Sequence, residues 1–100
     1  MNSNKDLKIL HETKYTIYSN GRILLKKFNR SIGTKNHDGY IMCSFNGKTQ
    51  LLHRIIYEKF KGEIPYGFYI KHINNDKDDN SIENLKSESR TEIEKKFIIV

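Results

Sequence analysis

The side chain best suited to chemistry in this sequence is that of His72, which closes an apolar segment and precedes a loop rich in Asn and Asp. Residues 69–85 read Tyr-Ile-Lys-His-Ile-Asn-Asn-Asp-Lys-Asp-Asp-Asn-Ser-Ile-Glu-Asn-Leu. A neutral imidazole can take a proton from water near neutral pH, and an asparagine can hold a loop through both halves of its amide. His72 is therefore a candidate general base. A histidine at the end of a strand is also commonly structural, and this alternative stays open.

The net charge of +6 is distributed unevenly along the 100 residues. Residues 1–62 contain 12 Lys and Arg against 4 Asp and Glu, whereas residues 63–100 contain 6 against 8. A basic segment attracts polyanions such as nucleic acid, and the alternative is a surface that only keeps the chain soluble. Lysine outnumbers arginine 14 to 4, which favours contact with phosphates over bidentate reading of bases.

Asn-Gly pairs at residues 20–21 and 46–47 predict two β-hairpins, because both central residues of a tight hairpin turn take positive φ. The flanking segments are rich in β-branched and aromatic residues, which favours strands. The predicted strands are residues 15–19, 22–28, 39–45 and 48–52. Residues 1–13 are expected to form a loose arm, and residues 29–38 a loop.

The hydrophobic period changes after residue 52, where Ile56 and Phe60 are spaced four apart. This spacing predicts a short amphipathic helix over residues 53–60, which Gly62 ends. A strand over residues 68–72 and a structured polar loop over residues 73–84 should follow. Two capping-box patterns near residue 90 predict a final helix. The predicted fold class is therefore α+β, with N-terminal antiparallel hairpins, a short helix and then a strand–loop–strand–helix unit.

The order of these motifs resembles the HNH nucleases of the phage and homing type, whose ββα-metal (His-Me finger) core cuts DNA. Residues 70–74 resemble the strand end that carries the catalytic histidine of that family, and residues 83–85 its central asparagine and leucine. Residues 52–56 with Phe60 are similar to the His-Arg-Leu-Val helix that precedes the core in many phage proteins. Residues 15–23 and the Gly39-Tyr40 pair look like the small β module ahead of phage HNH endonucleases.

The resemblance implies roles for particular residues. It makes His72 the general base and Asn84 the structural asparagine. It also implies a divalent metal ion, with Mg²⁺ the first choice, that neutralises charge on the scissile phosphate. The two positions where the family usually keeps metal ligands hold Lys71 and Ile93, and neither side chain can bind a cation. The metal ligands therefore stay unknown, and the substitutes considered are the carboxylates of Asp76, Glu92 and Glu94.

The same resemblance divides the chain into a β-rich DNA-contacting module over residues 1–52 and an HNH-like ββα core over residues 53–100, joined in one compact unit. The predicted function is that of an HNH-type DNA endonuclease that hydrolyses phosphodiester bonds. One alternative is a degenerate HNH-fold protein that binds DNA without cutting it. Another, from a different class, is a basic adaptor for RNA or an acidic protein. The residues predicted to contact DNA are Arg22, Lys26, Lys27, Arg30, Lys35, Arg54 and Lys71.

The expected setting is the cytoplasm of a bacterial or phage-infected host cell. The single cysteine, Cys43, excludes an internal disulfide and a multi-cysteine zinc site. No apolar run is long enough to span a bilayer, and no leader for secretion is expected. The oligomeric state, the target sequence and the choice between nicking and double-strand cleavage stay open.

Overall fold

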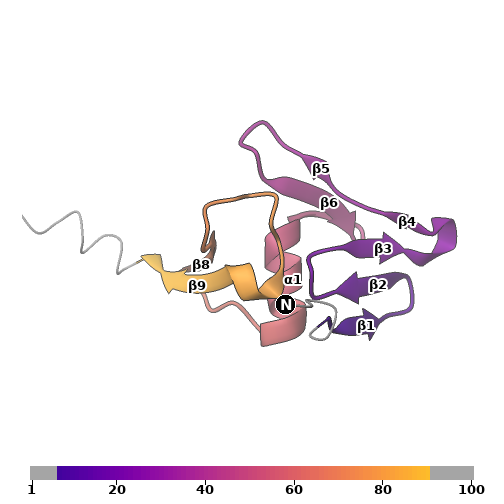
Figure 1. Ribbon diagram of the computed structural model, residues 1–100, viewed down its shortest axis with the longest axis horizontal. Helices are drawn as coiled ribbons and strands as arrows, with labels where there is room; N and C mark the ends of the chain where they lie inside the picture. The colour runs from indigo at the N-terminus through magenta and orange to yellow at the C-terminus, as the bar shows by residue number, and fades with distance from the viewer. Residues whose placement is uncertain (1–6, 91–100) are drawn as a thin grey trace, which may run out of the picture.

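The computed structural model describes residues 7–90, which form three small antiparallel sheets and one α-helix (Figure 1). The first sheet has the strand order β1 (Ile9–His11), β2 (Tyr15–Tyr18), β3 (Ile23–Leu25) and β4 (Arg30–Ser31). The expectation of a loose arm over residues 1–13 is wrong for β1, which pairs with β2. A strand can pair with the open edge of β2 through its main chain alone, without alternating hydrophobic residues. The sequence of residues 9–11 therefore gives little indication of β1. Residues 1–6 lie outside the described residues.

The first hairpin turn differs from the prediction. Of its two Asn-Gly residues, only Gly21 has positive φ, at 95°. The Gly21 N–H donates to the carbonyl of Tyr18, and the Tyr18 N–H donates to the carbonyl of Arg22. This pattern is a three-residue loop with a glycine bulge rather than a two-residue turn. The Ser19 backbone is held from outside the hairpin, because its carbonyl accepts the N–H of Ile82 at 2.8 Å.

The second sheet has the order β5 (Thr34–Lys35), β6 (Ile41–Phe45) and β7 (Lys48–Leu51). Its turn is the one predicted, with φ of 52° at Asn46 and 80° at Gly47. The loop expected over residues 29–38 instead contains β4 and β5, which pair with β3 and β6. These two-residue strands are too short to produce a pattern of their own. Between β3 and β4, a 3₁₀ turn η2 covers Lys26–Phe28.

The single α-helix of the described residues, α1, runs over Leu52–Lys61, one residue beyond the prediction at each end. It buries Leu52, Ile55 and Ile56 on one face, as its spacing predicts. The helix ends at Gly62, whose N–H donates to the carbonyl of Glu58 at 3.1 Å. Within residues 7–90, no helix is long and apolar enough to cross a membrane.

The third sheet is a hairpin of β8 (Phe68–His72) and β9 (Leu85–Ser89), with the 3₁₀ turn η3 (Ile82–Asn84) directly before β9. Its register places His72 opposite Leu85 and Lys71 opposite Lys86. Residues 73–81, which we call the Asn-rich loop, connect β8 to η3. The final helix predicted near residue 90 lies outside the described residues.

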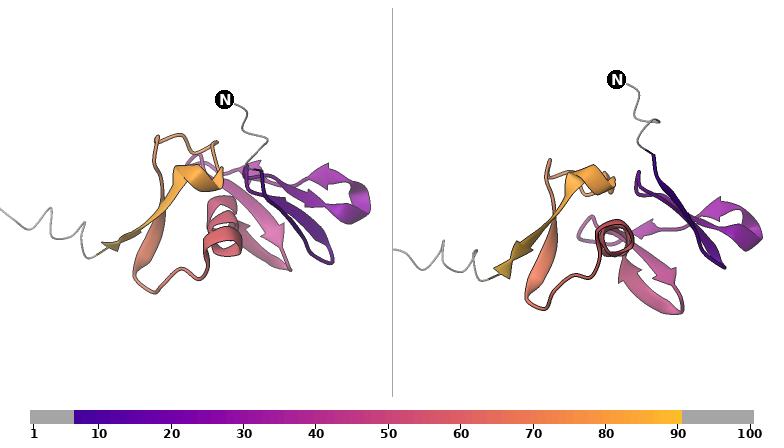
Figure 2. Two further views of the ribbon diagram at one scale, coloured as in Figure 1. Left: turned by 60° about the horizontal axis from the view of Figure 1, so that its bottom comes forward. Right: turned by 90° about the horizontal axis from the view of Figure 1, so that it is seen from below.

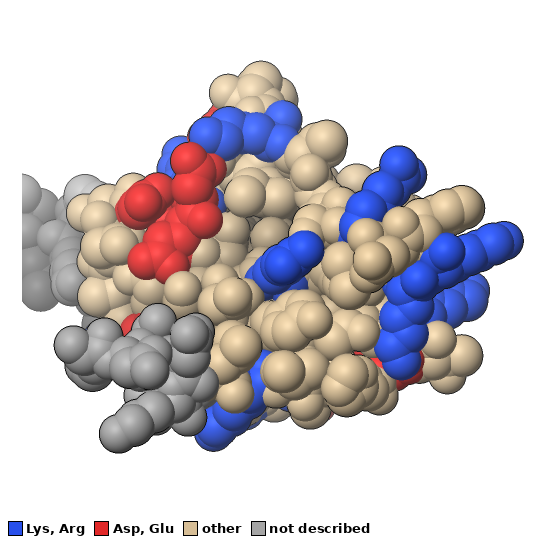
Figure 3. Space-filling model, turned by 45° about the vertical axis from the view of Figure 1, so that its right-hand side comes forward, with Lys and Arg blue, Asp and Glu red and all other residues tan. Residues whose placement is uncertain are grey.

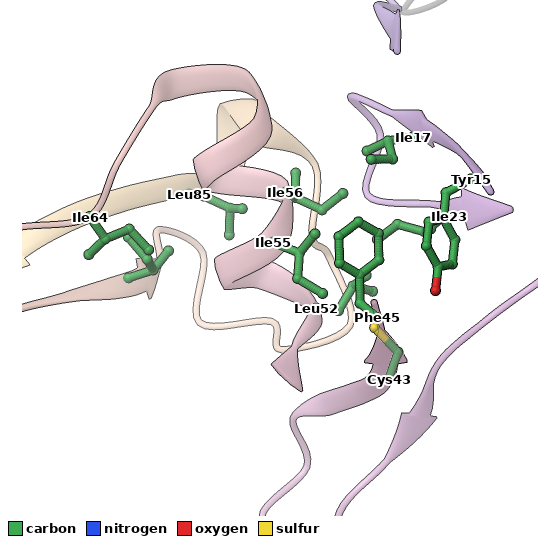
Figure 4. Packing of buried hydrophobic residues seen from close by; sticks show 11 residues of the cluster. Tyr15, Ile17, Ile23, Cys43, Phe45, Leu52, Ile55, Ile56, Ile64 and Leu85 are labelled. Atoms are coloured by element: carbon green, nitrogen blue, oxygen red, sulfur yellow. The ribbon is translucent and has the colours of Figure 1, made fainter. Parts of the chain in front are cut away.

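One hydrophobic core joins the two parts of the chain that the sequence suggested. Figure 4 shows Ile17, Ile23 and Phe45 from the N-terminal sheets close to Ile55 and Ile56 of α1. Figure 2 shows α1 lying between the β8–β9 hairpin and the two N-terminal sheets. Cys43 is buried in this core, and burial raises the pKa of its thiol to about 11. The full buried set is Tyr15, Ile17, Ile23, Cys43, Phe45, Leu52, Ile55, Ile56, Ile64, Ile70 and Leu85.

Candidate active site

His72 lies at the end of β8 with its side chain directed inward, and the residue is 5% exposed. The Nε2 atom of its ring is 2.7 Å from Oδ1 of Asn80, a buried residue of the Asn-rich loop. The other half of the Asn80 amide, Nδ2, donates to the carbonyl of Lys77. A carbonyl can only accept, so this contact orients the amide with Oδ1 toward the imidazole. Nε2 of His72 therefore carries the proton, and Nδ1 holds the free lone pair.

The lone pair of His72 Nδ1 has no hydrogen-bond partner among residues 7–90. This atom is not fully buried either. Among residues 7–90, the side-chain nitrogen that is both fully buried and without a partner is Nδ1 of His53, and Nδ1 of His72 does not meet both conditions. A basic nitrogen that is oriented from its far side and still reachable can accept a proton from a water molecule. Asn80 was not assigned this orienting role from the sequence, where its position eight residues after His72 gives no sign of a ring contact.

Asn84 holds the two ends of the Asn-rich loop together. Its Oδ1 accepts the N–H of Asn74 at 3.1 Å, and its Nδ2 donates to Oδ1 of Asn74 at 2.9 Å. The same Nδ2 also donates to the carbonyl of Asp79 at 2.8 Å. Asn84 is 8% exposed, so these bonds satisfy an amide that would otherwise be costly to bury. The geometry is that of a bracing residue, while a part for Asn84 in a reaction stays a prediction.

Short polar turns shape the remainder of the Asn-rich loop. Asn75 adopts a left-handed conformation with φ of 64°, and its N–H donates to the carbonyl of His72. Asp76 Oδ1 accepts the N–H of Asp78 at 3.0 Å. The hydroxyl of Ser81 donates to Asp79 at 2.7 Å, and this bond is the main reason why the pKa of Asp79 is lowered. The carboxylates of this loop therefore mainly hold its backbone.

The N-terminal sheets press against the Asn-rich loop. A Cβ at Gly21 would lie 2.6 Å from the backbone carbon and oxygen of Asn80, so only glycine fits there. Lys77 Nζ donates to the carbonyl of Asp38 at 2.8 Å. Lys35 forms an ion pair with Asp78 at 2.9 Å. The position of Asn80, and through it the ring of His72, thus depends on the first hairpin and on the loop before β6.

Two further rings stand beside His72. The ring centroid of His53 is 4.8 Å from that of His72, and the Tyr40 centroid is 6.1 Å from it. Lys77 Nζ lies 4.4 Å from the centre of the Tyr40 ring. Burial, with the charges of His72 and Arg54, lowers the pKa of His53 to about 4, so this ring is neutral at physiological pH. The sequence alone assigns neither His53 nor Tyr40 a contact with the ring of His72.

Arg54, predicted to contact DNA, lines a hollow of about 440 Å³ together with His53. Arg90 and Tyr69 also border this hollow. The hydroxyl of Tyr69 donates to Glu88 at 2.6 Å, which is the main reason why the pKa of Tyr69 is raised. His72 is not among the residues that line this hollow, but Tyr40 and His53, whose rings lie beside His72, are.

The other predicted DNA contacts separate into two groups. Arg22, Lys26, Lys27 and Arg30 are all exposed in the first sheet and its turns. Figure 3 shows Lys and Arg side chains projecting from this end of the molecule, with Asp and Glu gathered on another part of the same face. Lys35 is instead paired with Asp78. Lys71 is exposed on β8, directly across from Lys86 of β9.

The described residues do not bring together the side chains that commonly hold a divalent metal ion. Residues 7–90 contain no group of three or more His, Cys, Asp or Glu side chains placed to hold one. The family resemblance implies a metal ligand directly before His72, and this position holds the cation Lys71. A second cation, Lys86, lies opposite it on the neighbouring strand. Asp76 uses one carboxylate oxygen to hold the N–H of Asp78. Ile93, Glu92 and Glu94 lie outside the described residues.

A β-hairpin that ends its first strand in an oriented histidine, with an asparagine-braced loop and a preceding helix, defines the class of fold found in HNH nucleases. Residues 50–93 match the model of a protein family described as HNH endonuclease. This match and the α+β fold confirm the predicted resemblance to the HNH endonuclease family and the predicted fold class.

Among solved structures, the chain is similar to one described as "DNA binding and cleavage by the HNH homing endonuclease I-HmuI", with a TM-score of 0.72 and 23% identity. The similarity covers 86% of this chain and 53% of that chain. This chain thus spans about half the length of that protein, and the likeness establishes the fold of both its N-terminal hairpins and its core. Comparison with curated proteins found no significant match.

Proposed function

We propose that this chain is an HNH-type DNA endonuclease in which His72 is the general base. The observation that carries the proposal is the orientation of the His72 ring: Asn80 Oδ1 holds Nε2 at 2.7 Å and leaves Nδ1 as the proton acceptor. The family match over residues 50–93 supports a nuclease, and DNA is the substrate named for the similar structure. The proposed place of action is the cytoplasm of a bacterial or phage-infected cell.

The reaction assigned to these residues is the hydrolysis of a phosphodiester. Nδ1 of His72 takes a proton from water while the water oxygen forms a bond to phosphorus. The bond from phosphorus to one deoxyribose oxygen then breaks, and that oxygen takes a proton from solvent. The imidazolium formed at His72 is stabilised because its Nε2–H donates to Asn80, and a hydrogen bond from a charged donor is stronger than one from a neutral donor.

Positive charge on two surfaces supports DNA as the partner. The first sheet presents Arg22, Lys26, Lys27 and Arg30 to solvent, and these side chains can follow a phosphate backbone. Lys71 lies opposite Lys86 across β8 and β9 and is exposed, so it can contact a phosphate, whereas Lys86 forms an ion pair of 3.8 Å with Glu88. We therefore assign residues 1–52 mainly to DNA contact and residues 53–100 to the site of hydrolysis.

A second candidate is DNA binding without hydrolysis. The observation that favours it is again the Lys71–Lys86 pair, because Lys71 stands where the family resemblance implies a metal ligand. They can bind a phosphate, but they cannot bind the ion that commonly stabilises the departing oxygen. The requirement for a divalent ion, and for Mg²⁺ in particular, thus stays a prediction.

Conversion of supercoiled plasmid to nicked or linear forms tests the proposal. The protein is incubated with plasmid in Mg²⁺, in Mn²⁺ and in EDTA, and His72→Ala is assayed beside it. We expect cutting by the wild type in at least one condition and a loss of about 100- to 10,000-fold in His72→Ala. Cutting that survives in His72→Ala contradicts the role of His72. No cutting in any condition, together with salt-sensitive binding to duplex DNA, establishes the second candidate instead.

A further inference from the structure

Phe28 is the most exposed phenylalanine of the described residues, with 60% of its surface open to solvent. It closes η2, at the turn from β3 to β4, and no residue of η2 is buried. We call Lys26, Lys27, Phe28, Asn29 and Arg30 the basic tip. A single exposed apolar side chain is common on a protein surface, so its exposure alone indicates nothing.

The surroundings of Phe28 are what make it unusual. Lys27 Nζ and Arg30 Cζ each lie 5.6 Å from the centre of its ring. None of the ion pairs found within residues 7–90 involves a residue of the basic tip. The tip therefore presents an aromatic ring between cations that have no carboxylate partner in the described part of the chain.

Main-chain hydrogen bonds fix the turn that carries this ring. Asn29 adopts a left-handed conformation, with φ of 48° and ψ of 49°, and its N–H donates to the carbonyl of Lys26 at 3.2 Å. The Lys26 N–H in turn donates to the carbonyl of Lys14 at 2.9 Å. The short turn is thereby tied to the loop before β2, and it lies between β3 and β4 at one end of the first sheet (Figure 1).

We propose that the basic tip inserts the ring of Phe28 between stacked bases of duplex DNA, with Lys26, Lys27 and Arg30 on the flanking phosphates. Apolar wedges of this kind partly unstack a base step, and contacts to phosphate offset the cost. An apolar protein surface suits the tip less well, because covering the ring there would remove the neighbouring cations from water without neutralising them. The inference rests on the proposed function for its partner and adds a contact that the hydrolytic site does not need.

An anionic membrane is the other surface that attracts cations beside an aromatic ring. One ring on a three-residue turn offers little apolar area for insertion into lipid, since binding to a membrane scales with that area. Stacking on a base needs only one ring, and it contributes affinity whatever the base. The observations therefore favour DNA, and vesicles serve as a competing arm of the test.

The test compares Phe28→Ala with two other variants at exposed positions. Lys27→Ala removes one cation of the basic tip. Tyr66→Ala is the matched control, because Tyr66 is also an exposed aromatic residue but lies in the turn before β8. Affinity is measured by fluorescence anisotropy on a labelled duplex over a range of salt concentrations. Duplexes with 2-aminopurine at successive positions report local unstacking as a rise in fluorescence.

We expect Phe28→Ala to bind duplex DNA about 5- to 100-fold more weakly, with an unchanged salt slope and no rise in 2-aminopurine fluorescence. Lys27→Ala should lower the salt slope by about one, and Tyr66→Ala should match the wild type.

Equal affinity and equal fluorescence in Phe28→Ala and the wild type would overturn the inference, while salt-dependent binding by both would leave the proposed function standing. An effect of Phe28→Ala confined to vesicles with anionic lipid would also overturn it. A wild type that binds no DNA at all would overturn the proposed function as well.

Discussion

The basic tip and the Asn-rich loop carry their functional side chains in opposite ways. In the basic tip, cations and one ring stand in solvent, and a main-chain turn is what positions them. In the Asn-rich loop, side-chain amides hold each other, and His72, Asn80 and Asn84 are all buried. The first arrangement suits contact with a long charged backbone. The second suits the placing of a single ring.

The difference predicts how each region responds to change. Exposed cations contribute individually small amounts that add up, and salt screens them. A buried polar network is cooperative, so the loss of one member leaves its partners without hydrogen bonds. We therefore expect graded effects of substitution in the basic tip and abrupt effects in the Asn-rich loop.

The largest effect on stability should come from Gly21→Ala. The new Cβ would meet the backbone of Asn80 at 2.6 Å, in a residue with φ of 95°. We expect the free energy of unfolding to fall by about 3 kcal/mol or more, because neither backbone can move without breaking its bonds. Gly47→Ala is the control: its φ is 80°, but nothing lies within 4 Å of the added atom. The control should lose about 1 kcal/mol.

Urea unfolding of both glycine variants measures this difference. Equal losses for Gly21→Ala and Gly47→Ala would mean that backbone strain alone matters and that the first hairpin does not support the Asn-rich loop. A larger loss for Gly21→Ala would establish that the contact between the first hairpin and the Asn-rich loop contributes to the stability of the fold.

An effect of comparable size should follow from pH, through His53. The pKa of this ring is lowered from 6.5 to about 4 in the folded protein. Between these values the unfolded chain binds a proton that the folded chain does not, so stability falls as the pH is lowered. The loss should reach about 3 kcal/mol at the lower end of that range.

His53→Gln removes the titrating group and serves as the comparison. Its free energy of unfolding should change less than that of the wild type over the same pH range, whatever its stability at neutral pH. A wild-type curve that is flat between these pH values would show that the ring of His53 is not held away from solvent.

The smallest effect should come from Lys35→Ala. Its ion pair with Asp78 joins the two regions, but the side chains of both residues are 55% exposed. Exposed pairs contribute at most about 1 kcal/mol, so we expect a loss in that range that disappears at high salt. A loss of several kcal/mol in urea unfolding would indicate that the ion pair, rather than the contact at Gly21, joins the sheet to the loop.

The sequence predicted those parts of the fold that depend on neighbouring residues. The Asn46-Gly47 turn, the helix around Ile56 and the strand that ends at His72 all have local signals, and the structure contains them. It did not predict β1, which exists because β2 offers it an edge. Nor did it predict the bulged turn at Gly21, whose shape suits a contact with Asn80 about 60 residues away.

The candidate site divides in the same way. The motif predicts a histidine at position 72. It does not predict that Asn80 is the hydrogen-bond partner of this histidine, because the Asn-rich loop contains several asparagines. Which amide faces the ring is decided by the fold of that loop, and hence by contacts from the first hairpin. The proximity of Tyr40 and His53 to His72 likewise arises from the packing of separate elements.

The account depends most on the free lone pair at Nδ1 of His72. Long-range ¹H–¹⁵N correlation spectra report which nitrogen of a neutral imidazole carries the proton. We predict that neutral His72 is protonated at Nε2 and unprotonated at Nδ1, and that Asn80→Ala weakens this preference. A proton found on Nδ1 would contradict the account, because the basic nitrogen would then face Asn80 and could not take a proton from water.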